Sequence, residues 1–390
     1  MKSRARAAVV AAGAVTTVAV AVAAVLFGSG AFGSGPPLRA HAGLDARTTG
    51  HAPVARVLGR YAMPSGGETS ASFQGLAAAH GTVWVSGTSG PLGKAGSPSG
   101  FVLRYQGGRL AKLDAPLKPG TSEGGDVSAV GGLAWVLASD KGGAELLTTD
   151  GRTWRQDVRP TRRGFGAYGV TAVSERDIWV SGAKPDDHGD KQAPVLLHYD
   201  GTAWHRTDKG VGGDHDVLLF GMTARASNDV WTAGQRSLGT KNLDATPFLA
   251  HWDGRSWRRA HTPVRLGFVR SVAALTGADA WAVGGTDCSC SSEAGPLVLH
   301  YDGKTWRRTT TSGLRRALES VVQDGRGGLW AAESGGRVLH FDGRAWRPAT
   351  LPGQASATAV ARDPQTGRIY AIADEPEQND KVTGLLLELG

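Results

Sequence analysis

One repeated unit constrains the fold of this chain more than any other feature of its sequence. An apolar segment centred on tryptophan occurs six times, and a seventh copy has tyrosine at that position. The central residues are Trp84, Trp135, Trp179, Trp231, Trp281, Trp330 and Tyr370, and neighbouring ones are 40 to 52 residues apart. Repeats of this length are typical of β-propellers, in which each unit forms one four-stranded blade. We therefore predict an all-β, seven-bladed β-propeller over residues 53–390.

Most units contain a second tryptophan, which follows a predicted hairpin. The clear copies read His-aromatic-Asp-Gly-x-x-Trp and end at Trp204, Trp257, Trp306 and Trp346. Asp-Gly favours a two-residue turn, because glycine accepts a positive φ and aspartate tolerates it. The two repeat positions hold 11 of the 12 tryptophans, and Trp252 replaces the tyrosine before an Asp-Gly pair. Since a tryptophan buries about 150–250 Å², we interpret these residues as packing between blades and not as a ligand-binding surface.

The ends of the repeat region predict how the ring closes. The seventh unit ends at Gly390 with its third strand, whereas Val54 to Tyr61 form a strand-like segment that has no unit of its own. We expect this N-terminal strand to supply the outer strand of the last blade, because joining the first and last blades leaves only short, protected sheet edges.

The first 52 residues read as an export segment and a linker. Three basic residues within the first six precede an uncharged run over residues 7–27, which as a helix is about 31 Å long and spans a bilayer core. We expect a signal peptide or signal anchor over residues 1–27 and a flexible tether over residues 28–52. The propeller is then extracytoplasmic, either secreted or held in the membrane through residues 7–27 if this N-terminal helix is uncleaved.

The repeat carries a family resemblance. Residues 281–285 read Trp-Ala-Val-Gly-Gly, and residues 300–306 read His-Tyr-Asp-Gly-Lys-Thr-Trp. This pattern resembles propellers of the kelch and galactose-oxidase central-domain type, and it resembles the secreted Trp-rich propeller proteins of actinobacteria. The resemblance implies a fold and no particular activity. A copper-radical oxidase is not expected, because the chain has only six tyrosines and places both cysteines in one loop.

Candidate site residues lie in loops that we expect on the top face, where the connections between blades meet the loops between second and third strands. The densest cluster is acidic and predicts either a Ca²⁺ site or an exposed polar loop. Its members are Asp186, Asp187, His188, Asp190, Asp214, His215 and Asp216. Apart from Ca²⁺, no cofactor is expected. Cys288 and Cys290 predict a local disulfide, with free thiols or a soft-metal site as alternatives.

Two arginine pairs on the same face are candidate ligand-binding residues, Arg162 with Arg163 and Arg315 with Arg316. They suit anionic wall polymers or acidic sugars. The other arginines that follow the hairpin tryptophans are expected to protect the exposed outer strands from pairing with other chains. Nucleic acid is not an expected partner of an exported protein. The repeated histidines are interpreted as structural, because each lies in a different blade; they are His198, His251, His300 and His340.

The inner strands favour binding over catalysis. Five segments of these strands have uncharged, mostly small side chains: residues 75–77, 127–129, 170–172, 222–224 and 271–273. An enzyme is expected to bring carboxylates, histidines or arginines together there. We therefore predict a monomeric, non-catalytic interaction protein that recognises a cell-surface protein or an anionic glycan through its top-face loops. The alternative is a carbohydrate-active hydrolase or lyase on a propeller scaffold.

Overall fold

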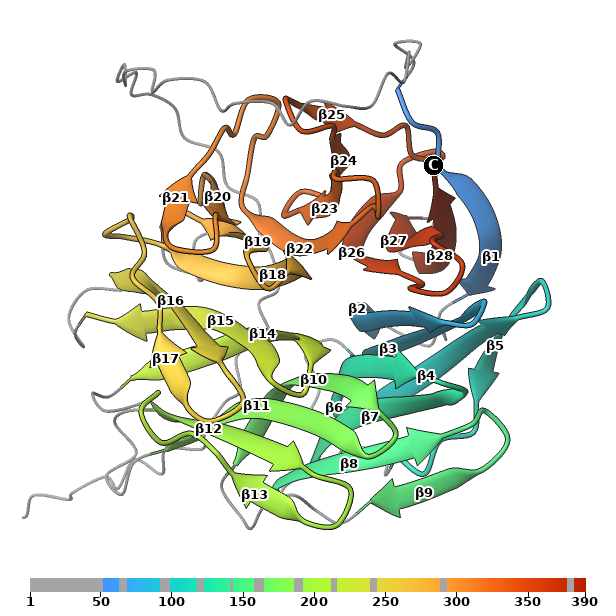
Figure 1. Cartoon of the computed structure of the whole chain (residues 1–390). Coiled ribbons are helices and arrows are strands. Elements are labelled where there is room, and N and C mark those ends of the chain that lie inside the picture. The colour runs from blue at the N-terminus through green and yellow to red at the C-terminus, as the bar shows by residue number, and fades with distance from the viewer. Residues whose placement is uncertain are drawn as a thin grey trace, which may run out of the picture. The chain divides into compact units, whose positions relative to one another are not determined.

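The predicted all-β, seven-bladed propeller is confirmed by the computed structural model, which forms seven four-stranded antiparallel sheets (Figure 1). The structure describes residues 52–62, 69–91, 99–117, 123–140, 143–157, 165–185, 192–211, 216–238, 244–287, 293–376 and 382–390. Within these ranges no helix has the length and apolar character needed to cross a membrane. The predicted leader over residues 1–27 and residues 28–51 of the predicted tether lie outside them.

Each of the first six blades uses four consecutive strands, listed here from the inner to the outer strand. Blade one has β2 (Thr69–Ala79), β3 (Thr82–Pro91), β4 (Ser99–Gln106) and β5 (Arg109–Leu113). Blade two has β6 (Glu123–Val130), β7 (Leu133–Asp140), β8 (Gly143–Thr149) and β9 (Trp154–Asp157). Blade three has β10 (Gly166–Ser174), β11 (Asp177–Pro185), β12 (Gln192–Tyr199) and β13 (Trp204–Arg206).

Blades four to six repeat this order with shorter outer strands. Blade four has β14 (Val217–Ala226), β15 (Asp229–Ser237), β16 (Ala245–Trp252) and β17 (Trp257–Arg259). Blade five has β18 (Phe268–Thr276), β19 (Asp279–Gly285), β20 (Pro296–Tyr301) and β21 (Trp306–Arg308). Blade six has β22 (Leu318–Gln323), β23 (Leu329–Glu333), β24 (Val338–Phe341) and β25 (Trp346–Pro348).

Blade seven combines strands from the two ends of the described chain. Its sheet contains β26 (Ser356–Arg362), β27 (Ile369–Pro376) and β28 (Val382–Leu389), followed by β1 (Arg56–Ala62) as the outer strand. In this antiparallel pair Arg56 lies opposite Glu388, to which its guanidinium is hydrogen-bonded. The N-terminal strand therefore occupies the position that a fourth strand of the last unit would otherwise fill.

Tryptophans pack one blade against the next, as the repeat predicts. The hairpin Trp257 of blade four lies edge-on to Trp179 of blade three, with ring centroids 5.9 Å apart. Trp306 of blade five repeats the contact with Trp231 of blade four at 5.2 Å. All four rings are buried. A blade cannot bury both of its faces alone, so these contacts between neighbours form the core of the ring.

The top-face loops meet as expected. The N–H groups of Gly267, Ala317 and Ala357, which lead into three successive inner strands, donate to carbonyls near the start of the third strand of the preceding blade. The acceptors are Ala245, Ala294 and Gly336 respectively. The connections between blades and the loops between second and third strands therefore share one face, which we call the top face.

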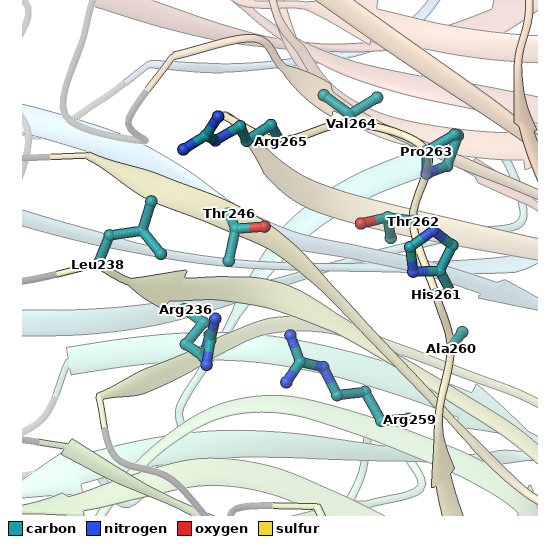
Figure 2. A pocket seen from close by; sticks show the side chains of 10 residues that line it. All are labelled: Arg236, Leu238, Thr246, Arg259, Ala260, His261, Thr262, Pro263, Val264 and Arg265. Carbon is teal, nitrogen blue, oxygen red and sulfur yellow. The ribbon is translucent and has the colours of Figure 1, made fainter.

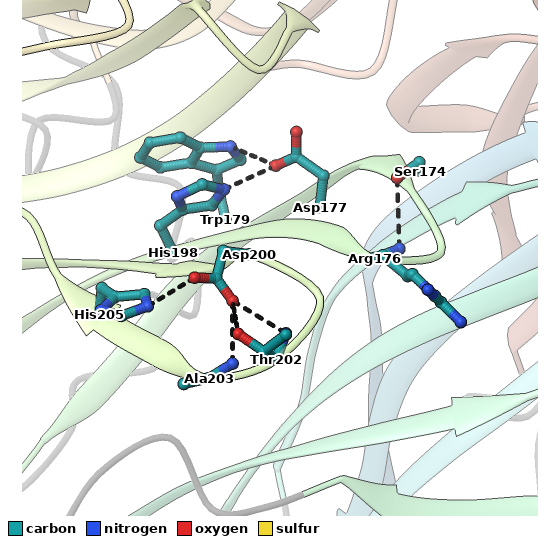
Figure 3. A network of polar contacts seen from close by, with 9 residues as sticks. All are labelled: Ser174, Arg176, Asp177, Trp179, His198, Asp200, Thr202, Ala203 and His205. Carbon is teal, nitrogen blue, oxygen red and sulfur yellow. Dashed lines mark hydrogen bonds and ion pairs between the residues drawn. The ribbon is translucent and has the colours of Figure 1, made fainter.

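The predicted two-residue Asp-Gly turns are wrong. Tyr199 pairs with Trp204, so the loop of blade three contains the four residues 200–203, and the hairpins at 150–153, 253–256, 302–305 and 342–345 have the same length. Asp200 Oδ1 accepts the backbone N–H groups of Thr202 at 2.8 Å and Ala203 at 2.9 Å (Figure 3). The aspartate side chain thus replaces strand hydrogen bonds that a tighter turn would provide, and the Thr202 hydroxyl and these N–H groups lower its pKa.

The repeated histidines belong to networks inside single blades. His198 Nε2 lies 2.9 Å from Asp177 Oδ1, and the same oxygen accepts the indole N–H of Trp179 at 2.9 Å. The His198 ring stacks on Trp179 with centroids 3.9 Å apart (Figure 3). His251, His300 and His340 make the corresponding contacts with Asp229, Asp279 and Asp324 at 2.8 to 3.0 Å. Among the described residues no three metal-ligating side chains come together.

Candidate functional site

A groove of about 780 Å³ opens at the top of blade four. The ends of β15, β16 and β17 contribute to it, together with the connection that runs from blade four to blade five. Its ten lining residues, shown in Figure 2, are Arg236, Leu238, Thr246, Arg259, Ala260, His261, Thr262, Pro263, Val264 and Arg265. We call this the blade-four groove.

The wall of the groove is a segment that bends at Pro263, Arg265 and Leu266 and is fixed at its two ends. Ala260 N–H donates to Leu249 O at 2.8 Å, and Gly267 N–H donates to Ala245 O at 2.8 Å. Gly267 has a φ of 133°, and a Cβ there would lie 2.3 Å from the Gly285 carbonyl oxygen, so only glycine fits. Pro263 has no backbone N–H, and between these anchors none of the other N–H groups of residues 261–266 donates to another described residue. The segment therefore has five main-chain donors without a partner among the described residues.

The described lining residues are basic or uncharged, and none of them is acidic. Arg236, Arg259 and Arg265 contribute three guanidinium groups, and His261 adds an imidazole. In Figure 2 the guanidinium groups of Arg236 and Arg259 are turned toward each other, while the hydroxyls of Thr246 and Thr262 face each other across the groove. Arg236 Nε is buried and has no hydrogen-bond partner among the described residues.

Exposed apolar side chains flank the basic lining. Only four large apolar side chains of the described residues are exposed, and two belong to this region: Leu238, which is 48% exposed, and Leu266, which is 42% exposed and follows Arg265. Large apolar side chains gathered on a surface mark contact sites. The groove thus offers charge for orientation and apolar surface for contact.

The predicted acidic cluster is represented in the structure by Asp216 alone. Its Oδ1 accepts the N–H of Gln192 at 3.3 Å, its carbonyl accepts the N–H of Ser237 at 2.9 Å, and its φ is 61°. Asp216 therefore connects the loop of blade three to β15. The other predicted Ca²⁺ ligands, residues 186–188, 190, 214 and 215, lie outside the described residues. The predicted disulfide of Cys288 and Cys290 and the pair Arg162 and Arg163 also lie outside them.

The second predicted arginine pair lies in a connection fixed by a buried acid. The backbone N–H groups of Arg315 and Arg316 both donate to Glu333 Oε1, the second at 2.8 Å. Burial by itself raises the pKa of Glu333, but the hydrogen bonds from Arg337 and from these two N–H groups lower it below its ordinary value. Arg316 also pairs with Glu293 at 3.3 Å. The backbone of Arg315 and Arg316 therefore has a structural role, and neither residue lines the blade-four groove.

The inner strands contain β-bulges, which their small, uncharged sequence segments did not predict. Each of the seven has a register shift near its start, which is the signature of a β-bulge. The residues at this bulge position are Gln74, Gly125, Tyr168, Phe220, Arg270, Glu319 and Thr358. The residue that follows it in blade two, Asp126, accepts the N–H of Val170 in the next blade at 3.1 Å, and burial raises its pKa to about 6.

Comparison with known proteins identifies the fold and no family. No family model matches the chain, and no curated protein matches it. The solved structure of YCF48 bound to D1 peptide is 12% identical, with a TM-score of 0.54 over 88% of this chain and 96% of that chain. Acylaminoacyl peptidase from Pyrococcus horikoshii is 10% identical, with a TM-score of 0.54 over 81% of this chain and 51% of that chain.

A third similar structure is an isolated propeller domain. The β-propeller domain of the Trilobed protease from Pyrococcus furiosus is 10% identical, with a TM-score of 0.51 over 78% of this chain and 91% of that chain. The chain therefore shares a propeller fold with a protein solved with a peptide and with the propellers of two peptidases. At these identities the likeness concerns the fold alone.

Proposed function

We propose that this protein is a non-catalytic interaction module that binds an extended, acidic segment of a partner protein in the blade-four groove. One observation carries the proposal: three arginines and a histidine line the groove, and none of its described lining residues is acidic. Arginine guanidinium groups match planar carboxylates through paired hydrogen bonds. Side-chain carboxylates of a partner supply the opposite charge.

The unpaired main chain favours a peptide over a glycan. Apart from Pro263, residues 261–266 have backbone N–H groups that donate to no other described residue, and a peptide supplies C=O groups that accept them. Leu238 and Leu266 then contact apolar side chains of the same segment. The groove volume of about 780 Å³ lies within the usual range for ligand sites. The solved peptide complex of YCF48 supports the idea that a propeller of this fold can hold a peptide.

The same lining argues against the carbohydrate-active alternative at this site. Glycoside hydrolysis uses two carboxyl groups separated by about 5 to 9.5 Å, and none of the ten described residues that line the groove has a side-chain carboxyl group. We place the module outside the cytoplasm, because the basic N-terminus and the apolar run over residues 7–27 read as an export segment. A cell-surface or secreted partner is the corresponding expectation.

Binding of two matched peptides to the full-length protein tests this proposal. One synthetic peptide alternates aspartate with leucine, and the other replaces every aspartate by asparagine; fluorescence anisotropy measures both. We expect the acidic peptide to bind and the neutral peptide to bind at least about tenfold more weakly, with affinity falling as salt is added. Equal binding of both peptides contradicts the proposal.

Three variants and a polymer locate the binding. We expect Arg236→Gln and Arg265→Gln each to weaken binding of the acidic peptide by about tenfold, since each removes a charged hydrogen-bonding group. The control is Arg344→Gln, which alters an exposed arginine in the four-residue hairpin loop of blade six and leaves affinity unchanged. Equal losses in all three variants contradict the proposal. Binding of polygalacturonate in place of the peptide favours a glycan ligand instead.

A further inference from the structure

We infer that the backbone N–H groups of Arg265 and Leu266 form a carboxylate-binding pair, which takes one acidic side chain of the partner bound in the blade-four groove. This inference rests on the proposed function and narrows it, because it makes a single acid of the partner segment essential and assigns that acid its donors. The reason is a precedent within the protein. The next connection between blades already holds a carboxylate on the equivalent pair of N–H groups.

The two connections can be matched residue by residue. Gly267 and Ala317 make the same backbone hydrogen bond, in which their N–H groups donate to a carbonyl six residues before the repeated histidine of the preceding blade. The two residues before Gly267 are therefore equivalent to the two before Ala317. This matches Arg265 and Leu266 with Arg315 and Arg316.

In blade six the chain itself supplies the carboxylate. The N–H groups of Arg315 and Arg316 both donate to Glu333 Oε1, the second at 2.8 Å. Arg337 Nε donates to the other oxygen, Oε2, at 2.7 Å. Burial raises the pKa of Glu333, but the hydrogen bonds from Arg337 and from the two N–H groups lower it below its ordinary value. Two successive N–H groups and one guanidinium thus hold an ionised carboxylate at this place in the fold.

Blade five cannot supply an acid in the same way. The residue equivalent to Glu333, three positions after the central tryptophan, is Gly284. A Cβ on Gly284 would lie 2.1 Å from the Phe268 carbonyl oxygen, so no side chain fits there. The N–H groups of Arg265 and Leu266 donate to no described residue. The carboxylate for this pair is therefore left to a ligand.

The groove also provides the guanidinium groups that accompany such a carboxylate. Arg236, Arg259 and Arg265 line it, as Arg337 accompanies Glu333 in blade six. Leu266, whose N–H belongs to the pair, is itself 42% exposed and offers apolar surface beside the carboxylate. A partner segment with one acid between apolar residues therefore meets the chemistry of this wall, and a uniformly acidic run is not required.

Amide-resolved NMR on the full-length protein tests the inference. The probe is a peptide with one central aspartate between two leucines, acetylated and amidated so that its only carboxylate is a side chain; its control has asparagine there. We expect the aspartate peptide to bind within about tenfold of the alternating aspartate–leucine peptide, and the asparagine control to bind at least about tenfold more weakly. The amide protons of Arg265 and Leu266 should move downfield on binding, whereas those of Arg315 and Arg316, already paired with Glu333, should not move.

The possible results separate this inference from the proposed function. If the alternating peptide binds and loses affinity in Arg236→Gln, but the amide protons of Arg265 and Leu266 do not move, the inference is overturned and the proposed function stands. If the single aspartate and asparagine peptides bind equally well while the alternating peptide still binds, the inference is overturned in the same way. If no acidic peptide binds, both are overturned.

Chemical rescue tests the precedent itself. Glu333→Ala removes the carboxylate and leaves its two backbone donors, so acetate should raise the thermal midpoint of this variant more than chloride does at equal ionic strength. The control is Asp279→Ala, which removes a partly exposed carboxylate that lies 2.9 Å from His300 Nε2. An equal response of the two variants to acetate overturns the inference. The NMR measurement on the unmodified chain decides the question if Glu333→Ala does not fold.

Discussion

The indole N–H of Trp257 in blade four donates to the Thr207 hydroxyl of blade three at 3.3 Å. One blade later the indole N–H of Trp306 is buried without a partner among the described residues. The position equivalent to Thr207 is there Ala260, which packs against the cluster that contains Trp306. These two contacts therefore differ by one hydroxyl. In the next interface the indole N–H of Trp346 is also buried without a described partner, although Thr309 holds the equivalent position, so the hydroxyl must also be turned toward the indole.

Ala260→Thr is predicted to stabilise the protein. The new hydroxyl accepts the orphaned N–H of Trp306 and removes the cost of an unsatisfied buried donor, which amounts to about 1 kcal/mol. Urea unfolding measures the change. The control is Ala349→Thr. Ala349 has the same position in blade six and the same backbone hydrogen bond, but the outer strand of the next blade is β1, which contains no tryptophan. Equal shifts in both variants would contradict the explanation.

Asp177→Ala is predicted to be strongly destabilising. Asp177 Oδ1 accepts both the Trp179 indole N–H and His198, and its side chain is only 13% exposed. Removing the carboxylate leaves two polar groups unpaired, at a cost of about 2 kcal/mol or more. Asp279→Ala, at the equivalent place in blade five, alters a side chain that is 41% exposed and should cost less. Thermal midpoints compare the two, and the reverse order would refute this account of the histidines.

Asp374 is predicted to make stability depend on pH. Burial raises its pKa from 3.8 to about 6, and its Oδ1 is buried without a partner among the described residues. The folded chain therefore holds this proton more tightly than the unfolded chain does, so stability falls as pH rises from about 4 to about 6 and then levels off. Burial also raises the pKa of Asp126 to about 6, so its ionisation lowers the stability over the same pH range.

The variant Asp374→Asn removes the part of the pH-dependent fall in stability that Asp374 causes. We expect a higher thermal midpoint than wild type at pH 7 and a smaller difference at pH 4, where the wild-type carboxyl is largely protonated. A midpoint difference that stays constant from pH 4 to pH 8 would show that Asp374 is not the titrating group.

Gly59 of β1 is predicted to be intolerant of a side chain. A Cβ there would lie 2.7 Å from Leu110 Cβ of blade one, so Gly59→Ala pushes the closing strand away from its neighbour. Overpacking of this kind costs about 1–3 kcal/mol. Gly132→Ala is the control, because a Cβ at Gly132 meets nothing within 4 Å. Equal stability of both variants, measured by urea unfolding, would argue against a close fit between β1 and blade one.

The repeat allowed the architecture to be predicted from sequence because packing recurs. Trp179, Trp231 and their equivalents contact the same neighbours in successive blades, so their spacing counts the blades. The turn length was not predictable from the Asp-Gly pair, since it depends on the Asp200 carboxylate accepting loop N–H groups. Local propensity favoured a shorter turn that side-chain hydrogen bonding overrides.

The groove and the β-bulges could not be predicted from the sequence, for different reasons. Arg236, Arg259 and Arg265 come from separate segments and meet only because Ala260 and Gly267 anchor the connection between them. In sequence Arg259 reads as one more edge-protecting arginine. The bulge recurs in all seven inner strands, but it shifts one residue out of register and is invisible in an alternating pattern.

Hydrogen exchange on the full-length protein tests the central claim most directly. The backbone amides of residues 261, 262 and 264–266 donate to no other described residue and should exchange fast in the free protein, whereas Pro263 has no amide hydrogen. Adding the alternating aspartate–leucine peptide should slow them by about tenfold or more, because the peptide pairs with these amides, and should leave the hairpin loops of the opposite face unchanged. Fast exchange at residues 261–266 with bound peptide, or protection confined to other loops, would contradict the account.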